Sequence, residues 1–246
     1  MESIVVRATN WIGDAVMSLP ALDALKRLYP NADISVLVKA HVAPVFENNP
    51  AVADIIIYDS SGTHKGLKGR IKLAGELKER SFDCAVLFQN AFEAALIVFL
   101  AKIPKRVGYS RDMRGVFLTD PVEASAEILK LHQVYYYLNI IESLGGEKIK
   151  EPLPSIVISR SEKDFAASYL RELGIEEGTK LIGASPGASY GKAKKWSPES
   201  FAYVLDEFSE KSKAEVLIFG AEGDLEDANS LSKLLSVKHH NLAAKT

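Results

Sequence analysis

Five short apolar runs, separated by segments with helical periodicity, constrain the fold of this chain more than any other feature. The runs cover residues 4–8, 34–38, 55–58, 84–88 and 106–109. They do not alternate polar with apolar residues, and strands that are buried on both faces of a sheet show this pattern. The first half is therefore predicted to be a Rossmann-like α/β domain, a parallel sheet covered by helices.

The same pattern restarts after a short polar connection. A helix is expected over 127–144 and should end at Gly145, because glycine tolerates the left-handed conformation that ends helices. The following residues, 146–155, contain two prolines and four charged residues, which indicates an exposed interdomain connection. We place the domain boundary between 1–148 and 149–246.

The second domain is predicted to be α/β as well, but incomplete. Helices are expected over 161–173, 197–211 and 224–235, and strands over 180–184 and 214–219, with a weak further strand starting at Asn241. A doubly wound sheet usually has four or more strands. The C-terminal domain is therefore expected to be truncated, with an uncovered apolar edge near 216–219.

Composition excludes several classes of protein. Lys and Arg total 30 and Asp and Glu total 32, so nothing in the overall charge favours nucleic acid as a partner. The one cysteine, Cys84, lies in an apolar run and fits a reducing cytosol. No secretory signal precedes the first strand, and the longest apolar stretch, 91–101, is too short to cross a bilayer. Any membrane contact is expected to be peripheral.

The first candidate site is the loop over 7–15, between the first predicted strand and the first helix. Open α/β sheets place ligands at the carboxyl ends of their strands. Gly13 is expected to allow a tight turn, and Asp14 fits either a helix N-cap or a general base. The dinucleotide fingerprint G-x-G-x-x-G is absent, so a nicotinamide-dependent enzyme has little support.

The second candidate site is the loop over 184–200, again between a strand and a helix. Small residues, the hydroxyls of Ser185 and Ser189 and three lysines meet the requirements of a phosphate site, although a solvated loop remains an alternative. Ser197 and Pro198 are expected to start the next helix as N-cap and first residue. No Walker A pattern occurs, which disfavours a P-loop kinase.

A third segment, 219–224, also follows a strand and precedes a helix. Glu222 can accept hydrogen bonds from a ribose or base, whereas Asp224 is better explained as a helix cap. The chain has no D-x-D motif and no His/Cys cluster with ligand spacing. This argues against a dedicated metal site or other cofactor but leaves room for a loosely bound divalent cation.

Three ordered motifs carry a resemblance to a known family. They are Trp-Ile-Gly-Asp-Ala-Val-Met-Ser-Leu-Pro over 11–20, Arg-Val-Gly-Tyr over 106–109 with Arg-Gly at 114–115, and Pro-Gly-Ala-Ser-Tyr-Gly over 186–191 with Ala-Lys-Lys-Trp over 193–196. Together they resemble the ADP-heptose:lipopolysaccharide heptosyltransferases of glycosyltransferase family 9, and especially the heptosyltransferase II branch. The resemblance runs through nearly the whole chain.

The resemblance implies a GT-B fold and inverting transfer of a heptose from ADP-heptose to the lipid A-linked inner core of lipopolysaccharide, at the cytoplasmic face of the inner membrane. It implies that Asp14 and Lys194 are catalytic, the first as base and the second against the donor phosphates. The expected donor-binding residues are Ser185, Gly187, Ser189, Lys194 and Glu222. The expected acceptor-binding residues are Asn10, Trp11, Gly13, Lys65, Lys68 and Arg70.

Three of these acceptor residues, with Lys72, lie in a glycine-rich segment that is predicted to be a flexible basic loop for an anionic acceptor, or else a solvated loop without a role. Family members continue beyond Thr246 into a helix whose N-terminus holds the donor diphosphate. This chain by itself is therefore expected to bind ADP weakly and to transfer no sugar, and a version extended by about 100 residues is expected to recover both. Two other functions stay open: a related GT-B transferase that uses another nucleotide sugar, and a noncatalytic acceptor-binding fragment.

Overall fold

The computed structural model describes residues 1–188 and 194–245 and divides the chain into two units, Met1–Ser159 and Arg160–Thr246. The division falls later than the boundary placed at 148/149. The connection contains no helix or strand but attaches to the first unit: Tyr135 Oη donates to the Lys150 carbonyl at 2.7 Å, and Ile149 packs against the first unit's core. Local composition gives no sign of such attachments.

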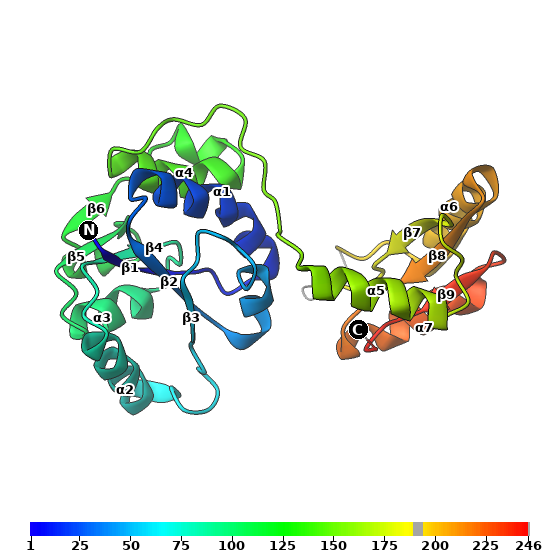
Figure 1. Ribbon diagram of the computed structural model, residues 1–246, viewed down its shortest axis with the longest axis horizontal. Helices are drawn as coiled ribbons and strands as arrows, with labels where there is room; N and C mark the ends of the chain where they lie inside the picture. The colour runs from blue at the N-terminus through cyan, green and yellow to red at the C-terminus, as the bar shows by residue number, and fades with distance from the viewer. Residues whose placement is uncertain (189–193, 246) are drawn as a thin grey trace. The chain divides into compact units, whose positions relative to one another are not determined.

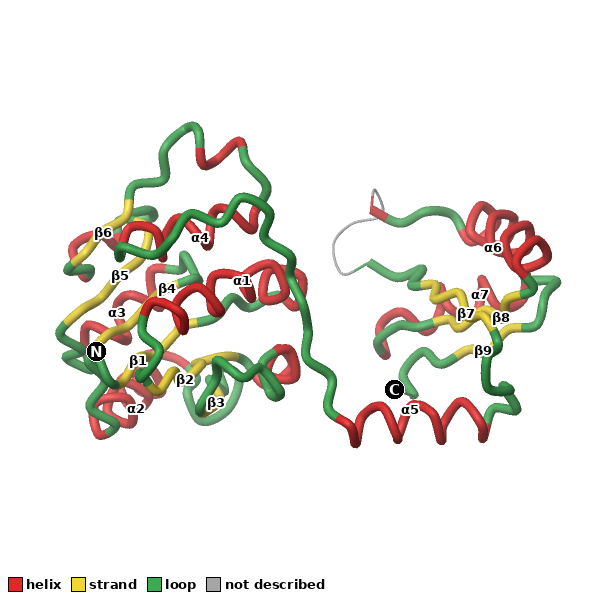
Figure 2. The backbone as a smooth tube through the Cα atoms, turned by 45° about the horizontal axis from the view of Figure 1, so that its top comes forward, coloured by secondary structure: helices red, strands yellow, loops and turns green. Residues whose placement is uncertain are grey.

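A six-stranded, wholly parallel sheet forms the centre of the first unit (Figures 1 and 2). Its strands are β1 (Ser3–Arg7), β2 (Asp33–Val38), β3 (Asp54–Ile57), β4 (Cys84–Leu87), β5 (Lys105–Tyr109) and β6 (Asp120–Val122). The order β3-β2-β1-β4-β5-β6 confirms the predicted Rossmann-like sheet, and β6 is a short edge strand that its sequence did not reveal. The strand order reverses between β1 and β4, where such sheets bind ligands.

Helices cover both faces of this sheet. On one face lie α1 (Ile12–Leu28) and α4 (Gln133–Ser143), and on the other α2 (Gly66–Glu79) and α3 (Phe92–Leu100). Successive residues of a strand point to opposite faces. Alternate residues of β1 accordingly enter different cores: Val6 packs with α1 and α4, and Val5 packs with α2 and α3.

The helix predicted over 127–144 is wrong in its first turn. The chain forms a short 3₁₀ helix, η3 (Ile128–Lys130), and then α4, for which His132 is the N-cap. Its ring Nδ1 accepts a bond from the Val134 N–H at 3.4 Å. The predicted end is confirmed, since Gly145 follows α4 with φ of +97°.

The flexible basic loop predicted over 65–72 is also wrong, because it forms the start of α2. Its glycines suggested turns, but Gly69 serves close packing instead. A Cβ on Gly69 would lie 2.2 Å from the backbone carbonyl carbon of His64. The glycine therefore lets the helix pack tightly against the turn that precedes it.

The second unit has a three-stranded parallel sheet in the order β7-β8-β9. Its strands and helices are α5 (Arg160–Glu172), β7 (Lys180–Ala184), α6 (Pro198–Ser212), β8 (Ala214–Ile218), η5 (Glu222–Asp224), α7 (Leu225–Leu234) and β9 (His239–Asn241). All these strands and helices were predicted to within a few residues, except the 3₁₀ turn η5. Helices α6 and α7 share one core with the sheet, and Tyr169 and Leu170 of α5 contribute to another.

The uncovered edge expected near 216–219 is wrong for β8. This strand is central, paired with β7 on one side and β9 on the other, and Val216 and Ile218 are fully buried. The weak strand signal at Asn241 corresponds to β9, which supplies the missing neighbour. Only Phe219, directly after the strand, is substantially exposed.

Candidate functional site

Helix α1 begins earlier than the sequence suggested, and this changes the roles of two residues. Trp11 is its N-cap, so Asp14 is the third residue of the helix, and the N-cap interpretation of Asp14 is wrong. Gly13 lies within the first turn without a positive φ, and a Cβ there would meet nothing within 4 Å. The tight-turn interpretation of Gly13 is therefore also wrong. The glycine instead leaves open space beside the aspartate.

The Asp14 carboxylate is partly buried, and no described residue donates a hydrogen bond to it. Burial raises the pKa of Asp14 above its ordinary value. Tyr137 of α4 lies near enough that, after burial, the charge of Asp14 contributes to raising the pKa of Tyr137. Asp14 thus combines a raised proton affinity with free acceptor capacity, at the strand end where the topology expects a ligand.

The loop after β4 lies beside the loop after β1. The N–H groups of Phe88 and Gln89 both donate to the carbonyl of Arg7, at 3.1 and 3.2 Å. This places Gln89 and Asn90 next to the β1–α1 loop, on the other side of the switch point.

Arg114 holds this second loop in place although it is fully buried. Its guanidinium donates to the carbonyl of Tyr109 at 2.8 Å, to Oδ1 of Asn90 at 2.9 Å and to the carbonyl of Gln89. Asn90 in turn donates through Nδ2 to the Tyr136 hydroxyl at 2.9 Å. Burial lowers the pKa of Arg114 to about 10, so the side chain stays charged at neutral pH.

Arg7 holds the β1–α1 loop in place in a similar way. Its Nη2 donates to Oδ1 of Asn10 at 2.8 Å, and its guanidinium carbon lies 5.2 Å from the ring centroid of Tyr58. The Asn10 carbonyl lies 3.1 Å from Nε2 of His41. Nε of Arg7 has no partner among the described residues, and burial lowers the pKa of Arg7 to about 10. Two buried cations therefore support the two loops that flank the switch point.

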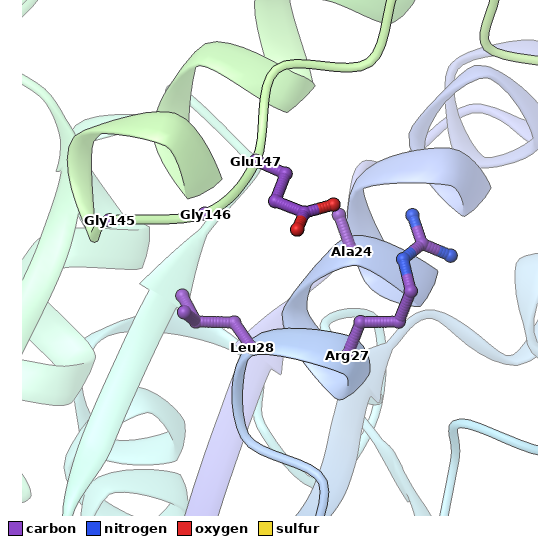
Figure 3. Close-up of a pocket in the computed structure, with 6 residues that line it drawn as sticks. All are labelled: Ala24, Arg27, Leu28, Gly145, Gly146 and Glu147. Carbon is purple, nitrogen blue, oxygen red and sulfur yellow. The ribbon is translucent and has the colours of Figure 1, made fainter.

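Of two cavities in the first unit, one lies beside the β1–α1 loop and the other lies far from it. One of about 520 Å³ lies at the carboxyl ends of β2 and β3 and includes Lys39 and His41 in its lining, beside Asn10. Another, of about 320 Å³, lies between the last turns of α1 and the chain after α4. Figure 3 shows the carboxylate of Glu147 pointing toward α1 in this second cavity. Because α1 rises 1.5 Å per residue, the second cavity is about 20 Å along the helix from Asp14 and is no part of the site.

In the second unit, the loops that follow β7 and β8 contact each other closely at the carboxyl edge of the sheet. A Cβ on Gly187 would lie 2.0 Å from Oδ1 of Asp224, so only glycine fits there. Asp224 is the N-cap of α7, as predicted, but its carboxylate accepts from the Ala221 N–H at 3.0 Å rather than from the helix's amides. Asp224 thereby fixes the loop after β7 against the loop after β8.

This contact predicts that the destabilisation caused by one substitution can be reversed by a second. Gly187→Ala should destabilise the second unit by roughly 1–3 kcal/mol, the cost of overpacking. Asp224→Gly should remove most of that cost, because the Cβ of Asp224, which alanine would keep, also lies only 2.6 Å from the added methyl carbon. Urea unfolding of the two single variants and the double variant measures the coupling. Gly223→Ala is the control, because a Cβ there meets nothing within 4 Å. Additive effects at positions 187 and 224 would contradict the packing argument.

The other predicted donor-binding residues lie around the same edge. Ser185 follows β7 and is exposed, Glu222 lies exposed in η5, and Lys194 is exposed. Ser189 lies outside the described residues. Ser197 caps α6, accepting from the Ser200 N–H at 3.1 Å with Pro198 as first helical residue, as predicted.

The predicted acceptor-binding residues come from the starts of two helices. Asn10, Trp11 and Gly13 lie at the start of α1, with the Trp11 ring half-exposed. Lys65 and Lys68 are exposed near the start of α2, and Arg70 is paired with Glu93. The sequence did not reveal the roles of Arg7, Gln89, Asn90 and Arg114, or the contact of Asp224 with Gly187. Position directly after a predicted strand was the available signal for Gln89 and Asn90.

Two Rossmann-like units with loop clusters at the carboxyl ends of parallel strands are the architecture of GT-B glycosyltransferases. The sequence pattern of glycosyltransferase family 9 (heptosyltransferase) matches residues 70–246. The chain belongs to this family.

Known proteins of similar sequence and structure agree with that assignment. The chain is 28% identical to lipopolysaccharide heptosyltransferase 2 of Escherichia coli K12, over 99% of this chain and 71% of the relative. It is 29% identical to lipopolysaccharide heptosyltransferase 2 of Salmonella typhimurium LT2, with the same coverage. The fold matches a glycosyl transferase family 9 structure from Veillonella parvula with a TM-score of 0.91 at 23% identity, over 100% of this chain and 70% of that one. It matches E. coli ADP-heptose lps heptosyltransferase II with a TM-score of 0.80 at 27% identity, over 100% and 73%.

Proposed function

We propose that this protein transfers a heptose from ADP-heptose to the inner core of lipopolysaccharide. Family membership and the matches to heptosyltransferases 2 support the reaction class and the substrates. The structural observation that carries the proposal is Asp14, a partly buried carboxylate with a raised pKa and no hydrogen-bond donor among the described residues, at the switch point of the first sheet. A general base for a sugar hydroxyl needs this position and this freedom.

The proposed chemistry is a single displacement. The acceptor hydroxyl oxygen forms a bond to the anomeric carbon of the heptose while the bond from that carbon to the diphosphate oxygen breaks. The hydroxyl proton passes to Asp14, and ADP leaves with the bonding electrons. In this scheme Asn10, Trp11 and the space beside Gly13 receive the acceptor, and Arg7 and Arg114 keep the flanking loops in position.

On the donor side, we assign Lys194 to the diphosphate, Ser185 and the Gly187 backbone to the same group, and Glu222 to the nucleoside. Lys195 is unsuited to this role because its ammonium lies 2.5 Å from Oδ2 of Asp227, which raises the pKa of Lys195.

The neighbouring lysines provide a test of the donor assignment. Lys194→Ala should weaken ADP binding by roughly tenfold or more, since a hydrogen bond to a charged group contributes about 1.5–3 kcal/mol. Lys195→Ala should change it little. Calorimetric titration with ADP measures both, and a larger loss from Lys195→Ala would reverse the assignment. Lys192, the third lysine of this loop, lies outside the described residues.

We also propose that the protein works in the cytoplasm, in peripheral contact with the inner membrane. No helix in the described part of the chain has the length and apolarity needed to cross a bilayer. The proposed acceptor is anchored in lipid, so its sugars are presented at a membrane surface.

Mass spectrometry of the products tests the proposed function. Incubation of the protein, in the version extended by about 100 residues, with ADP-heptose and a core acceptor that lacks the heptose should yield an acceptor heavier by one heptose, together with free ADP. Transfer from a different nucleotide sugar instead would favour a related GT-B transferase. Acceptor binding without any turnover would favour a noncatalytic fragment.

A further inference from the structure

Helix α3 exposes an apolar outer face, which is unusual for a surface helix. Its only charged residue, Glu93, is engaged by Arg70 of α2 at 2.7 Å. Phe92, Phe99 and Leu100 are exposed, because they lie on the side of the helix that faces away from the sheet core. A helix with this composition is normally covered on all sides.

The exposed apolar surface continues onto both neighbours of α3. Phe117 of η2 (Arg114–Phe117) contacts Phe92 and Phe99, with ring centroids 5.3 and 5.1 Å apart. Figures 1 and 2 show α2 beside α3, and Leu67 and Ile71 of α2 are exposed on either side of Arg70. We call the following residues the apolar patch: Leu67, Ile71, Phe92, Phe99, Leu100 and Val116, with exposed fractions between 38% and 79%.

Positive charge lies beside this patch, in a protein that is slightly acidic overall. Residues 65–80 contain six lysines and arginines and two glutamates, against 30 and 32 in the whole chain. Lys65 and Lys68 are exposed, and Lys72, also exposed, approaches Glu76 only to 4.0 Å. Apolar side chains interspersed with lysines fit the interface of an anionic bilayer, where the side chains enter the acyl boundary and the ammonium groups meet the headgroups.

The apolar patch also begins at the candidate site. Helices α2 and α3 both start at the carboxyl edge of the sheet, and Phe92 follows Asn90 by two residues. A membrane in contact with the patch would therefore lie next to the loops that are assigned to the acceptor.

We propose that the apolar patch and the lysines of α2 dock the protein onto the anionic bilayer that carries its lipid-linked acceptor. This inference rests on the proposed function, because that function supplies the lipid-anchored substrate. A second copy of the chain would also cover an apolar face, but the excess of like charge beside the patch disfavours self-association.

Vesicle sedimentation tests the proposal without any turnover. The protein should bind vesicles of phosphatidylethanolamine and phosphatidylglycerol, lose binding as salt is raised, and bind pure phosphatidylcholine vesicles weakly. The double variant L67Q/I71Q should bind the anionic vesicles at least about tenfold more weakly, because it withdraws two apolar side chains from the interface. The control Y203Q/F208Q changes two side chains of α6 that are similarly exposed, at 70% and 64%, and should leave binding unchanged.

Transfer assays separate this proposal from the proposed function. L67Q/I71Q should transfer normally to a water-soluble acceptor without lipid and poorly to a lipid-linked acceptor in vesicles. Undiminished vesicle binding by that variant, or an equal loss in the control, would overturn the docking surface. So would a wild-type dimer in sedimentation velocity that L67Q/I71Q converts to a monomer without a change in vesicle binding. Absence of transfer by the wild-type protein to either acceptor would instead contradict the proposed function.

Discussion

Asp14→Asn should lower kcat by roughly 10²-fold or more, which is the scale expected for a lost general base. The protein should remain folded. The amide has nearly the same shape as the carboxylate but does not accept a proton. Because Asp14 receives no side-chain or backbone hydrogen bond from the described residues and does not cap α1, the substitution should cost little stability. Single-turnover kinetics and thermal unfolding measure the two effects separately.

The pH profile gives an independent test of the same role. A base must be ionised, so activity should fall as the pH falls through the pKa of Asp14. Since burial raises that pKa, the acid limb should lie above the ordinary range of an aspartate. The limb should disappear in Asp14→Asn. Wild-type turnover by this variant, or an unchanged acid limb, would remove Asp14 from the mechanism.

Arg114→Met should destabilise the first unit by on the order of 3 kcal/mol or more, because buried acceptors that lose their donor cost about 1–3 kcal/mol each. The carbonyls of Gln89 and Tyr109 and the Asn90 side chain all accept from this guanidinium. Methionine fills much of the volume but donates nothing. Chemical denaturation measures the loss, and kcat should also fall in the conservative variant Arg114→Lys, because lysine does not reproduce the planar set of donors.

Arg106→Met is the matched control. Arg106 also donates to backbone carbonyls, those of Phe117 and Ile103, but it lies at the amino end of β5 and is only partly buried. Water can replace its hydrogen bonds, so we expect a loss of about 1 kcal/mol and an unchanged kcat. Equal effects of the two substitutions on kcat would mean that Arg114 does not position the Gln89–Asn90 loop for catalysis.

Local sequence was sufficient to predict the strands and several helix ends, because these depend on neighbouring residues. The strands of both sheets follow from apolar runs, and the Ser197–Pro198 start of α6 and the Gly145 end of α4 follow from capping rules. Local sequence failed where glycine had more than one explanation. The glycines over 62–69 suggested a loop, whereas Gly69 is required by a contact with His64 that holds helix α2 against its preceding turn.

The sequence by itself determined the fold class, the two α/β units and the position of Asp14 after the first strand, because apolar periodicity and motif spacing are encoded by near neighbours. Only the tertiary structure decided which residues support the loops after the strands within each unit. Arg114 reaches Asn90 across 24 positions, Arg7 reaches Tyr58 across 51, and Gly187 meets Asp224 across 37. Such partners are brought together by the order of strands in the sheet, and hydrogen bonds that close long loops leave no periodic trace in the chain.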